Sequence, residues 1–305
     1  MKFGATLPLV QQMPGTPAWE AGDDVRALIA VAQRADELGY AWAPCSDHVI
    51  VPRRALPTMG AAWYEPATTL AFVAGSTQRL RLLTHVLILP YHSPFDVAKQ
   101  YATLDRLSGG RVILGVGAGH LRREFLALGA DFDGRGVVTD EYIRLIDALW
   151  TREEASFQGE RYQFEEFHLA PRPLQQPRPP IWVGGNSRRA ARRAAELADG
   201  WVPWEVTPED VRDRLEYVDR LGLRATPLEV VVPAGPVEIT AQAVDGERAR
   251  FTGSREQVID DVRAYREAGV TGMTVSFLSR SLEERLEQLE CFAREIAPAF
   301  GQPSA

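Results

Sequence analysis

Residues 111–125, RVILGVGAGHLRREF, join a short apolar segment to a charged one through three alternating glycines. The pattern indicates a buried strand that turns into a helix. It is not the dinucleotide-binding fingerprint, because the position of the third glycine is held by His120 when counted from Gly115 and by Arg122 when counted from Gly117. The rest of the chain must explain why this strand ends in so much glycine.

Eight short runs, this one included, have the composition of buried strands. They are rich in Val, Ile, Leu and aromatic residues and cover residues 2–8, 40–47, 81–89, 111–117, 180–185, 199–203, 228–235 and 272–277. Helical periodicity lies between them, as at 22–38, 94–107, 187–198, 207–221 and 254–268. Ser254 and Gln257 have the spacing of a capping box. Apolar strands that alternate with helices form parallel sheets, and eight units predict an α/β fold of the (β/α)8 TIM-barrel type, with a doubly wound sheet as the alternative.

One stretch between the fourth and fifth predicted strands interrupts this alternation. Residues 150–180 show no helical period, and five of the last ten are proline. We interpret the stretch as an insertion within a single domain that covers residues 1–305, and we expect it to cross the mouth of the barrel. A surface excursion with no part in the site is the alternative.

The composition argues against several classes of protein. The 305 residues carry a formal net charge of -7 and the pI is near 5.4, so a nucleic-acid partner is not expected. No apolar run approaches the roughly 20 residues of a membrane helix, and the first ten residues lack the features of a signal peptide, so we expect a cytoplasmic protein. Cys45 and Cys291 are expected to be reduced packing thiols, and no histidine or cysteine spacing predicts a metal site.

The glycines of the opening stretch have a role if the fold is a barrel. Ligands of such barrels bind where the strands end and the following loops begin. Gly117, Ala118 and Gly119 would then lie at the mouth, where the absence of side chains lets a flat ligand or a phosphate approach the backbone. Close packing of strands and helices is the alternative reason for these residues.

A second strand end has the features of an anion site. Gly184 and Gly185 lead through Asn186 and Ser187 into a basic helix. This arrangement directs backbone N–H groups and the helix dipole at an anion. A phosphate-bearing ligand fits it, and an ordinary capped turn is the alternative.

Asp47 and His48 end the second predicted strand. Neighbours on an extended segment point to opposite faces, so Asp47 is not expected to orient His48 as in a catalytic triad. His48 could serve as an acid or base near neutral pH, and a structural histidine is the alternative. The chain contains no P-loop, no H-E-x-x-H motif and no G-x-S-x-G elbow, which argues against zinc and serine-nucleophile chemistry.

Five segments together resemble the bacterial luciferase-like superfamily, in particular its deazaflavin-dependent oxidoreductases. They are SDHV (46–49), LLTHVLILPYHSPFDVAKQYATLDRLSGGRVILGVGAGHLRREFLALG (82–129), DEYIRLIDALW (140–150), PIWVGGNSRRAARRAAELADGWVP (180–203) and TGSREQVIDDVRAYREAGVTGMTV (252–275). The resemblance covers most of residues 3–297 and is weakest at 234–250. It implies a (β/α)8 barrel that binds coenzyme F420 or, in sister branches, FMN.

The resemblance also implies roles for individual residues. Asp47 and His48 would lie near the reactive edge of the cofactor ring, with His120 at the same mouth. Further cofactor contacts would come from the third-strand bulge (Thr84, His85 and Val86), the fourth-strand glycine segment (Gly117, Ala118 and Gly119) and the phosphate turn (Gly184, Gly185, Asn186 and Ser187). The family's bulge implies a cis peptide between His85 and Val86.

The function implied is hydride transfer between coenzyme F420 and an unidentified organic substrate, with His48 or His120 moving the coupled proton and Asp47 beside them. A sugar phosphate is not expected, because relatives that oxidise one carry a tryptophan near the position of Pro52 and a glutamate in place of His120. An FMN-dependent monooxygenase supplied by a separate reductase is the first alternative, and a non-catalytic flavin-binding protein is the second. A homodimer is expected by analogy.

The acidic tail of coenzyme F420 would favour a basic rim. Six arginines follow the two glycine-rich turns, at 122, 123, 188, 189, 192 and 193. We therefore expect local positive charge at the mouth despite the net acidity of the chain. Solvated helix faces are the alternative account of these residues.

Overall fold

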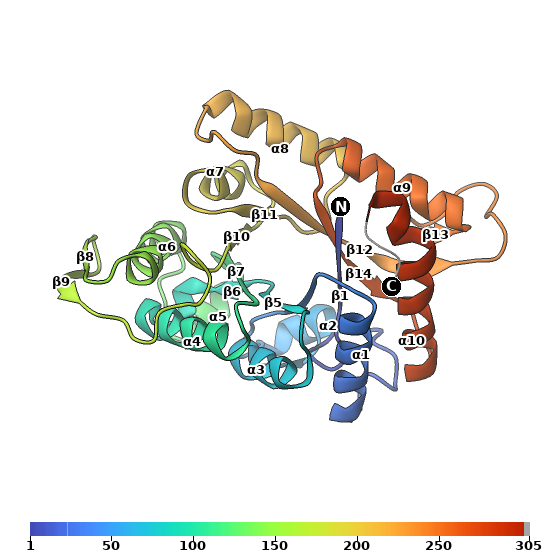
Figure 1. Cartoon of the computed structure of the whole chain (residues 1–305), viewed down its shortest axis with the longest axis horizontal. Helices are drawn as coiled ribbons and strands as arrows, with labels where there is room; N and C mark the ends of the chain where they lie inside the picture. The colour runs from blue at the N-terminus through green and yellow to red at the C-terminus, as the bar shows by residue number, and fades with distance from the viewer. Residues whose placement is uncertain (23, 302–305) are drawn as a thin grey trace.

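A computed structural model describes residues 1–22 and 24–301, and it contains a barrel of eight parallel strands surrounded by helices (Figure 1). The strands follow one another around the sheet in chain order: β1 (Lys2–Ala5), β3 (Trp42–Cys45), β5 (Arg81–Thr84), β7 (Val112–Gly117), β10 (Ile181–Gly184), β11 (Gly200–Val202), β12 (Glu229–Ile239) and β14 (Gly272–Phe277). The Ala41 amide donates to the Phe3 carbonyl at 2.7 Å, so the two ends of the sheet meet. Seven of these strands lie within predicted runs, β12 continues four residues past its run at 228–235, and the (β/α)8 barrel is confirmed.

The main helices begin at residues whose side chains cap their first turn. They are α1 (Val25–Glu37), α3 (Pro66–Ser76), α4 (Pro94–Leu107), α6 (Arg135–Thr151), α7 (Arg188–Leu197), α8 (Pro208–Leu221), α9 (Arg255–Glu267) and α10 (Leu282–Cys291), of which α6 lacks a side-chain cap. The predicted capping box of Ser254 and Gln257 is present at α9. Within the described ranges, no helix is both long and apolar enough to cross a membrane.

The interior of the barrel is filled by large apolar side chains. Trp42 and Trp182 meet edge to face with ring centroids 5.4 Å apart. The Trp42 indole donates to Thr274 Oγ1 at 2.8 Å, and a side chain at Gly4 would overlap that indole. This layer fills the barrel beneath the mouth and separates the carboxyl ends of the strands from their amino ends.

The insertion does not cross the mouth of the barrel. It forms a hairpin of β8 (Ala155–Gln158) and β9 (Gln163–Phe167), which Figure 1 shows beside α6 at the far left. Its Tyr162 ring packs on Phe95 of α4 at 5.1 Å, and Lys99 of α4 donates to the Ala170 carbonyl. The expectation was wrong because the segment joins the end of α6 to the start of β10, and both lie opposite the mouth.

Two short strands from different loops form a ribbon at the mouth. β2 (Gln11–Gln12) follows the first barrel strand, and β4 (Ala62–Trp63) follows the second and is preceded by α2 (Leu56–Met59). They pair antiparallel, with Gln11 opposite Trp63. Gly60, at φ +70°, precedes β4, and a side chain there would clash with the Gln12 carbonyl oxygen. We call these two strands the mouth ribbon.

The loop after the mouth ribbon's first strand is fixed to α10 by a buried ion pair. Arg285 donates to Glu20 at 2.6 Å, and both side chains are almost entirely buried. The same guanidinium donates to Ser279 Oγ and to the Phe277 carbonyl. The remaining short elements are β6 (Leu87–Ile88), β13 (Thr252–Gly253), α5 (Arg122–Ala127), 3₁₀ turns at Arg53–Ala55, Leu89–Tyr91 and Ala297–Phe300, and a π turn at Phe292–Ile296.

Candidate active site

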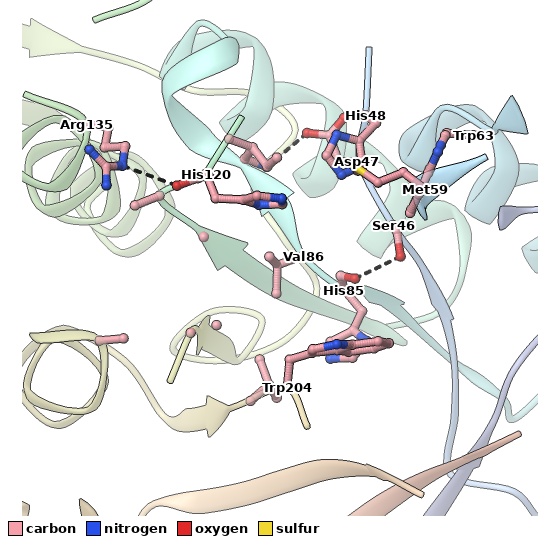
Figure 2. A pocket seen from close by; sticks show the side chains of 18 of the residues that line it. Ser46, Asp47, His48, Met59, Trp63, His85, Val86, His120, Arg135 and Trp204 are labelled. Atoms are coloured by element: carbon pink, nitrogen blue, oxygen red, sulfur yellow. Dashed lines mark hydrogen bonds between the residues drawn. The ribbon is translucent and has the colours of Figure 1, made fainter. Parts of the chain in front are cut away.

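A cavity of about 550 Å³ opens at the carboxyl ends of the strands (Figure 2). Most of the predicted site residues line it: Asp47, His48, His85, Val86, Gly117, Ala118, Gly119, His120, Gly184, Gly185 and Ser187. They come from the ends of β3, β5, β7 and β10, which the barrel brings together from distant parts of the chain. The volume is in the range of small-molecule and cofactor sites.

Two predicted residues do not line the cavity. Thr84 is fully buried, and its hydroxyl donates to the Gly115 carbonyl at 2.7 Å. Asn186 turns its amide to the backbone of Trp204, donating to the carbonyl at 2.5 Å and accepting from the amide at 2.8 Å. Thr84 therefore ties two barrel strands together, and Asn186 positions Trp204, which does line the cavity.

His48 is held by a carboxylate from the opening stretch. Its Nδ1 lies 2.8 Å from Oε2 of Glu124, a fully buried residue of α5. The other Glu124 oxygen accepts from the amides of Val49 at 2.8 Å and Ile50 at 3.2 Å. Because Nδ1 faces Glu124, Nε2 is the ring nitrogen left for the cavity.

Asp47 points away from His48, as the extended geometry predicts. Its Oδ2 accepts from the Ile88 amide at 2.9 Å and lies 2.7 Å from Nε2 of His92. Asp47 therefore joins the end of β3 to the segment after β5. His120 lies on the other side of His48, with the two rings perpendicular and their centroids 6.0 Å apart.

The pKa shifts in this cluster have identifiable causes. Burial alone would raise the pKa of Glu124, but hydrogen bonds from His48, the Ile50 amide and Tyr91 outweigh it and hold that pKa below its usual range. Burial and the neighbouring His48 lower the pKa of His120. Burial also lowers the pKa of His85 to about 4. At neutral pH the cluster therefore combines an ionised Glu124 with neutral His120 and His85.

Val86 forms an apolar ridge on the cavity floor. The His85–Val86 peptide is cis, as predicted from the family's bulge. A side chain at Gly117 would approach Val86 Cγ2 to 2.7 Å, and one at Gly184 would approach Cγ1 to 2.8 Å. These glycines are thus required by contact with Val86, and together the three residues provide a narrow apolar support suited to one face of a flat ring.

The turn into α7, where the sequence predicts an anion site, lies at the cavity. Gly185 has a φ of +117° and no side chain. Its carbonyl accepts a hydrogen bond from the Trp201 indole at 2.8 Å. Ser187 caps α7 by accepting from the Ala190 amide. Arg135 and Arg193 line the same part of the cavity, although Arg193 is paired with Asp140.

The basic rim is weaker than the sequence suggests. Four of the six arginines are paired with carboxylates, namely Arg122 with Asp133, Arg188 with Asp213, Arg192 with Glu196 and Arg193 with Asp140. Pairing offsets much of their charge. Exposed pairs are also readily screened by salt.

Sequence reasoning missed several residues of the site. They are Glu124, Tyr91 and His92 behind the histidines, and Gln11, Met13, Met59, Trp63, Arg135 and Trp204 on the wall. Glu124 stands among arginines in a helix start, where a carboxylate looks solvent-exposed. Its position four residues after His120 on a strand-to-helix turn was the one available signal.

Comparison with known proteins identifies the family. The model of the luciferase-like monooxygenase family matches residues 1–243. The chain belongs to this family. A relative named FMNH2-dependent dimethylsulfone monooxygenase, from Pseudomonas putida, is 36% identical over 289 residues, which cover 77% of this chain and 78% of the relative. The predicted luciferase-like superfamily is confirmed.

Solved structures share the fold over the whole chain. The monooxygenase RslO1 from Streptomyces bottropensis has a TM-score of 0.81 at 23% identity, covering 99% of this chain and 100% of that one. A coenzyme F420-dependent tetrahydromethanopterin reductase from Methanopyrus kandleri has a TM-score of 0.76 at 16% identity, covering 98% and 99%. Proteins that share this barrel include one named a monooxygenase and one named a coenzyme F420-dependent reductase. The fold alone therefore does not distinguish these two functions.

Proposed function

We propose that the protein transfers a hydride between coenzyme F420 and an organic substrate in this cavity. The observation that carries the proposal is the contact between buried Glu124 and His48 beside His120. Hydride transfer to or from a carbon that bears oxygen requires a proton to move at the adjacent atom. A histidine oriented by a carboxylate at the cavity edge is suited to that transfer.

His48 and Glu124 would have different roles in the reaction. Glu124 accepts a hydrogen bond from Nδ1 of His48, so neutral His48 has its lone pair on Nε2. With an alcohol as substrate, Nε2 of His48 would accept the hydroxyl proton as the carbon is oxidised. Tyr91 and the Val49 and Ile50 amides keep Glu124 ionised while this happens.

The cavity fits a deazaflavin or flavin ring with a phosphate. Val86, Gly117 and Gly184 would support the ring, and Gly185 with Ser187 at the start of α7 would hold the phosphate. When bound, a deazaflavin supplies a hydride donor or acceptor at one ring carbon.

An FMNH2-dependent monooxygenase is the second candidate. It is favoured by one observation, the 36% identity to the relative of that name. A cofactor titration separates the two candidates, and we expect coenzyme F420 to bind at least tenfold more tightly than FMN. Its affinity should fall as salt rises, because part of the attraction comes from screened charges. Fluorescence quenching at two ionic strengths measures both effects.

Two results would overturn the deazaflavin proposal. Tighter binding of FMN, together with oxygen consumption on adding reduced FMN, would identify a monooxygenase. A protein that binds coenzyme F420 but oxidises no substrate above the uncatalysed rate would be a binding protein without catalysis.

Replacing Gly185 by aspartate is expected to weaken F420 binding more than tenfold. Its φ of +117° disfavours any side chain, and a carboxylate would lie where the phosphate is proposed. Fluorescence titration gives the two dissociation constants. Gly222→Asp is the matched control, because Gly222 has φ +61° at the end of α8 and open space around it. Equal affinity of both variants would place the phosphate elsewhere.

A further inference from the structure

The cavity has two chemically different ends (Figure 2). Arg135 lies at one end, where its Nε donates to the Gly119 carbonyl at 3.2 Å. Trp63 and Met59 lie at the other end, and the two catalytic histidines lie between. Ring contacts agree with this order, because His48 is 4.5 Å from Trp63 and 6.0 Å from His120 between ring centroids.

The second end is built by the mouth ribbon and α2. Gln11 and Trp63 are directly opposite in the ribbon, so their side chains share one face, and both line the cavity. Met13 and Met59 complete this wall. Methionine side chains adapt to irregular apolar ligands, so the wall suits a hydrocarbon body.

This end carries no charge of its own. Among the described residues that line the cavity, the acidic and basic ones besides histidine are Asp47, Arg135 and Arg193. Asp47 is bonded to His92 and the Ile88 amide. Arg135 lies at the first end, and Arg193 donates to the carbonyl of Gly136, the next residue along the chain from Arg135. An anionic substrate would therefore have no cation to meet beside His48.

Trp63 contributes its ring to this end, and not its N–H group. Its indole Nε1 is buried, so it does not reach a ligand in the cavity. The ring meets His48 edge to face at 71°, so a ligand oxygen bound here would be next to the proton-transferring imidazole. Gln11 contributes a polar group, with its Oε1 3.1 Å from Ser46 Oγ.

We propose that Gln11, Met13, Met59 and Trp63 form the substrate subsite, and that it binds a small uncharged ketone or alcohol with an apolar body. The inference rests on the proposed function, which makes His48 the proton-transferring group. The substrate oxygen faces Nε2 of His48, and the methionines contact the hydrocarbon. The substrate is small because the cavity of about 550 Å³ must hold the cofactor ring as well.

Binding can be measured without turnover. Saturation-transfer difference NMR on the F420-loaded protein would compare cyclohexanone, benzyl alcohol and 2-butanone with cyclohexanecarboxylate, benzoate and butanoate. We expect the neutral set to bind at least tenfold more tightly. Met59→Ala, which removes part of the apolar wall, should weaken cyclohexanone binding about three- to tenfold. Met59→Lys should reverse the preference in favour of the carboxylates.

Leu107→Lys is the matched control for Met59→Lys. Leu107 is 80% exposed at the end of α4 and does not line this cavity. The preference for the neutral set should be unchanged in that variant. Equal effects of Met59→Lys and Leu107→Lys, or tighter binding of the carboxylates to the unaltered protein, would overturn the subsite.

The two proposals fail in different ways. If the neutral set binds as expected but no hydride passes to or from F420, the subsite stands and the proposed function is wrong. If F420-dependent turnover occurs only with anionic substrates and is unchanged by Met59→Lys, the proposed function stands and the subsite is wrong.

Discussion

Replacing His48 by alanine is expected to lower kcat for the proposed F420-dependent hydride transfer by about two to four orders of magnitude, while the fold and cofactor affinity are retained. The expectation follows from the position of His48, which contacts Glu124 through Nδ1 and faces the cavity through its other nitrogen. Stopped-flow absorbance of the cofactor gives the rate, and fluorescence titration gives its affinity. His168→Ala should change neither, because His168 is exposed on the β9 side of the hairpin segment.

Glu124→Gln separates orientation from proton transfer. The amide would offer a donor or an acceptor where the carboxylate now only accepts, so the ring of His48 could flip its tautomer and lose its lone pair at Nε2. Glu124 is a positioning residue, and the variant should lower kcat and alter its pH profile with cofactor affinity unchanged. Wild-type turnover in both His48→Ala and Glu124→Gln would give His48 a structural role only.

Replacing Arg285 by leucine destabilises the protein by about 3–5 kcal/mol, since it leaves Glu20 buried without its partner. Burial already raises the pKa of Glu20 against the opposing effect of Arg285. Without the arginine, the folded protein would bind a proton at Glu20 more readily than the unfolded chain does. The loss of stability should therefore be complete at high pH and smaller as pH falls through the raised pKa.

Urea unfolding at pH 5 and pH 8 measures this effect. Arg280→Leu is the control, because Arg280 pairs with Glu284 while 90% of its side chain is exposed, and such pairs contribute little. The double variant Glu20→Gln with Arg285→Leu should recover part of the stability and lose the pH dependence. An equal loss for Arg285→Leu and Arg280→Leu would show that the buried pair stabilises nothing.

The barrel was predictable because its signals are local. Each strand is a short apolar run, and helix starts such as Ser254 and Ser187 carry their caps in sequence. The position of the insertion was not predictable in the same way. Its prolines indicate an irregular segment, but its side of the barrel follows from the direction of α6, and the contacts with Phe95 and Lys99 are long-range.

The residues of the site also differ in whether a local sequence pattern reveals them. Residues at strand ends, such as His48 and Gly117, were found because a barrel gathers strand ends at one mouth. Glu124 was missed because its burial depends on the segment after β3 folding over it, which no local pattern reveals. The mouth ribbon was missed because two-residue strands have no periodicity to detect.

The mouth ribbon has a consequence for how this protein can change its specificity. Its strands belong to two loops separated by about fifty residues, yet Gln11 and Trp63 depend on each other for their placement. A chimera that exchanges only one loop would mismatch the ribbon and lose the pocket. Exchanging residues 8–19 and 51–64 together would transfer both strands of the ribbon, while Glu20 stays paired with Arg285 and the histidine cluster and the turn into α7 are unchanged.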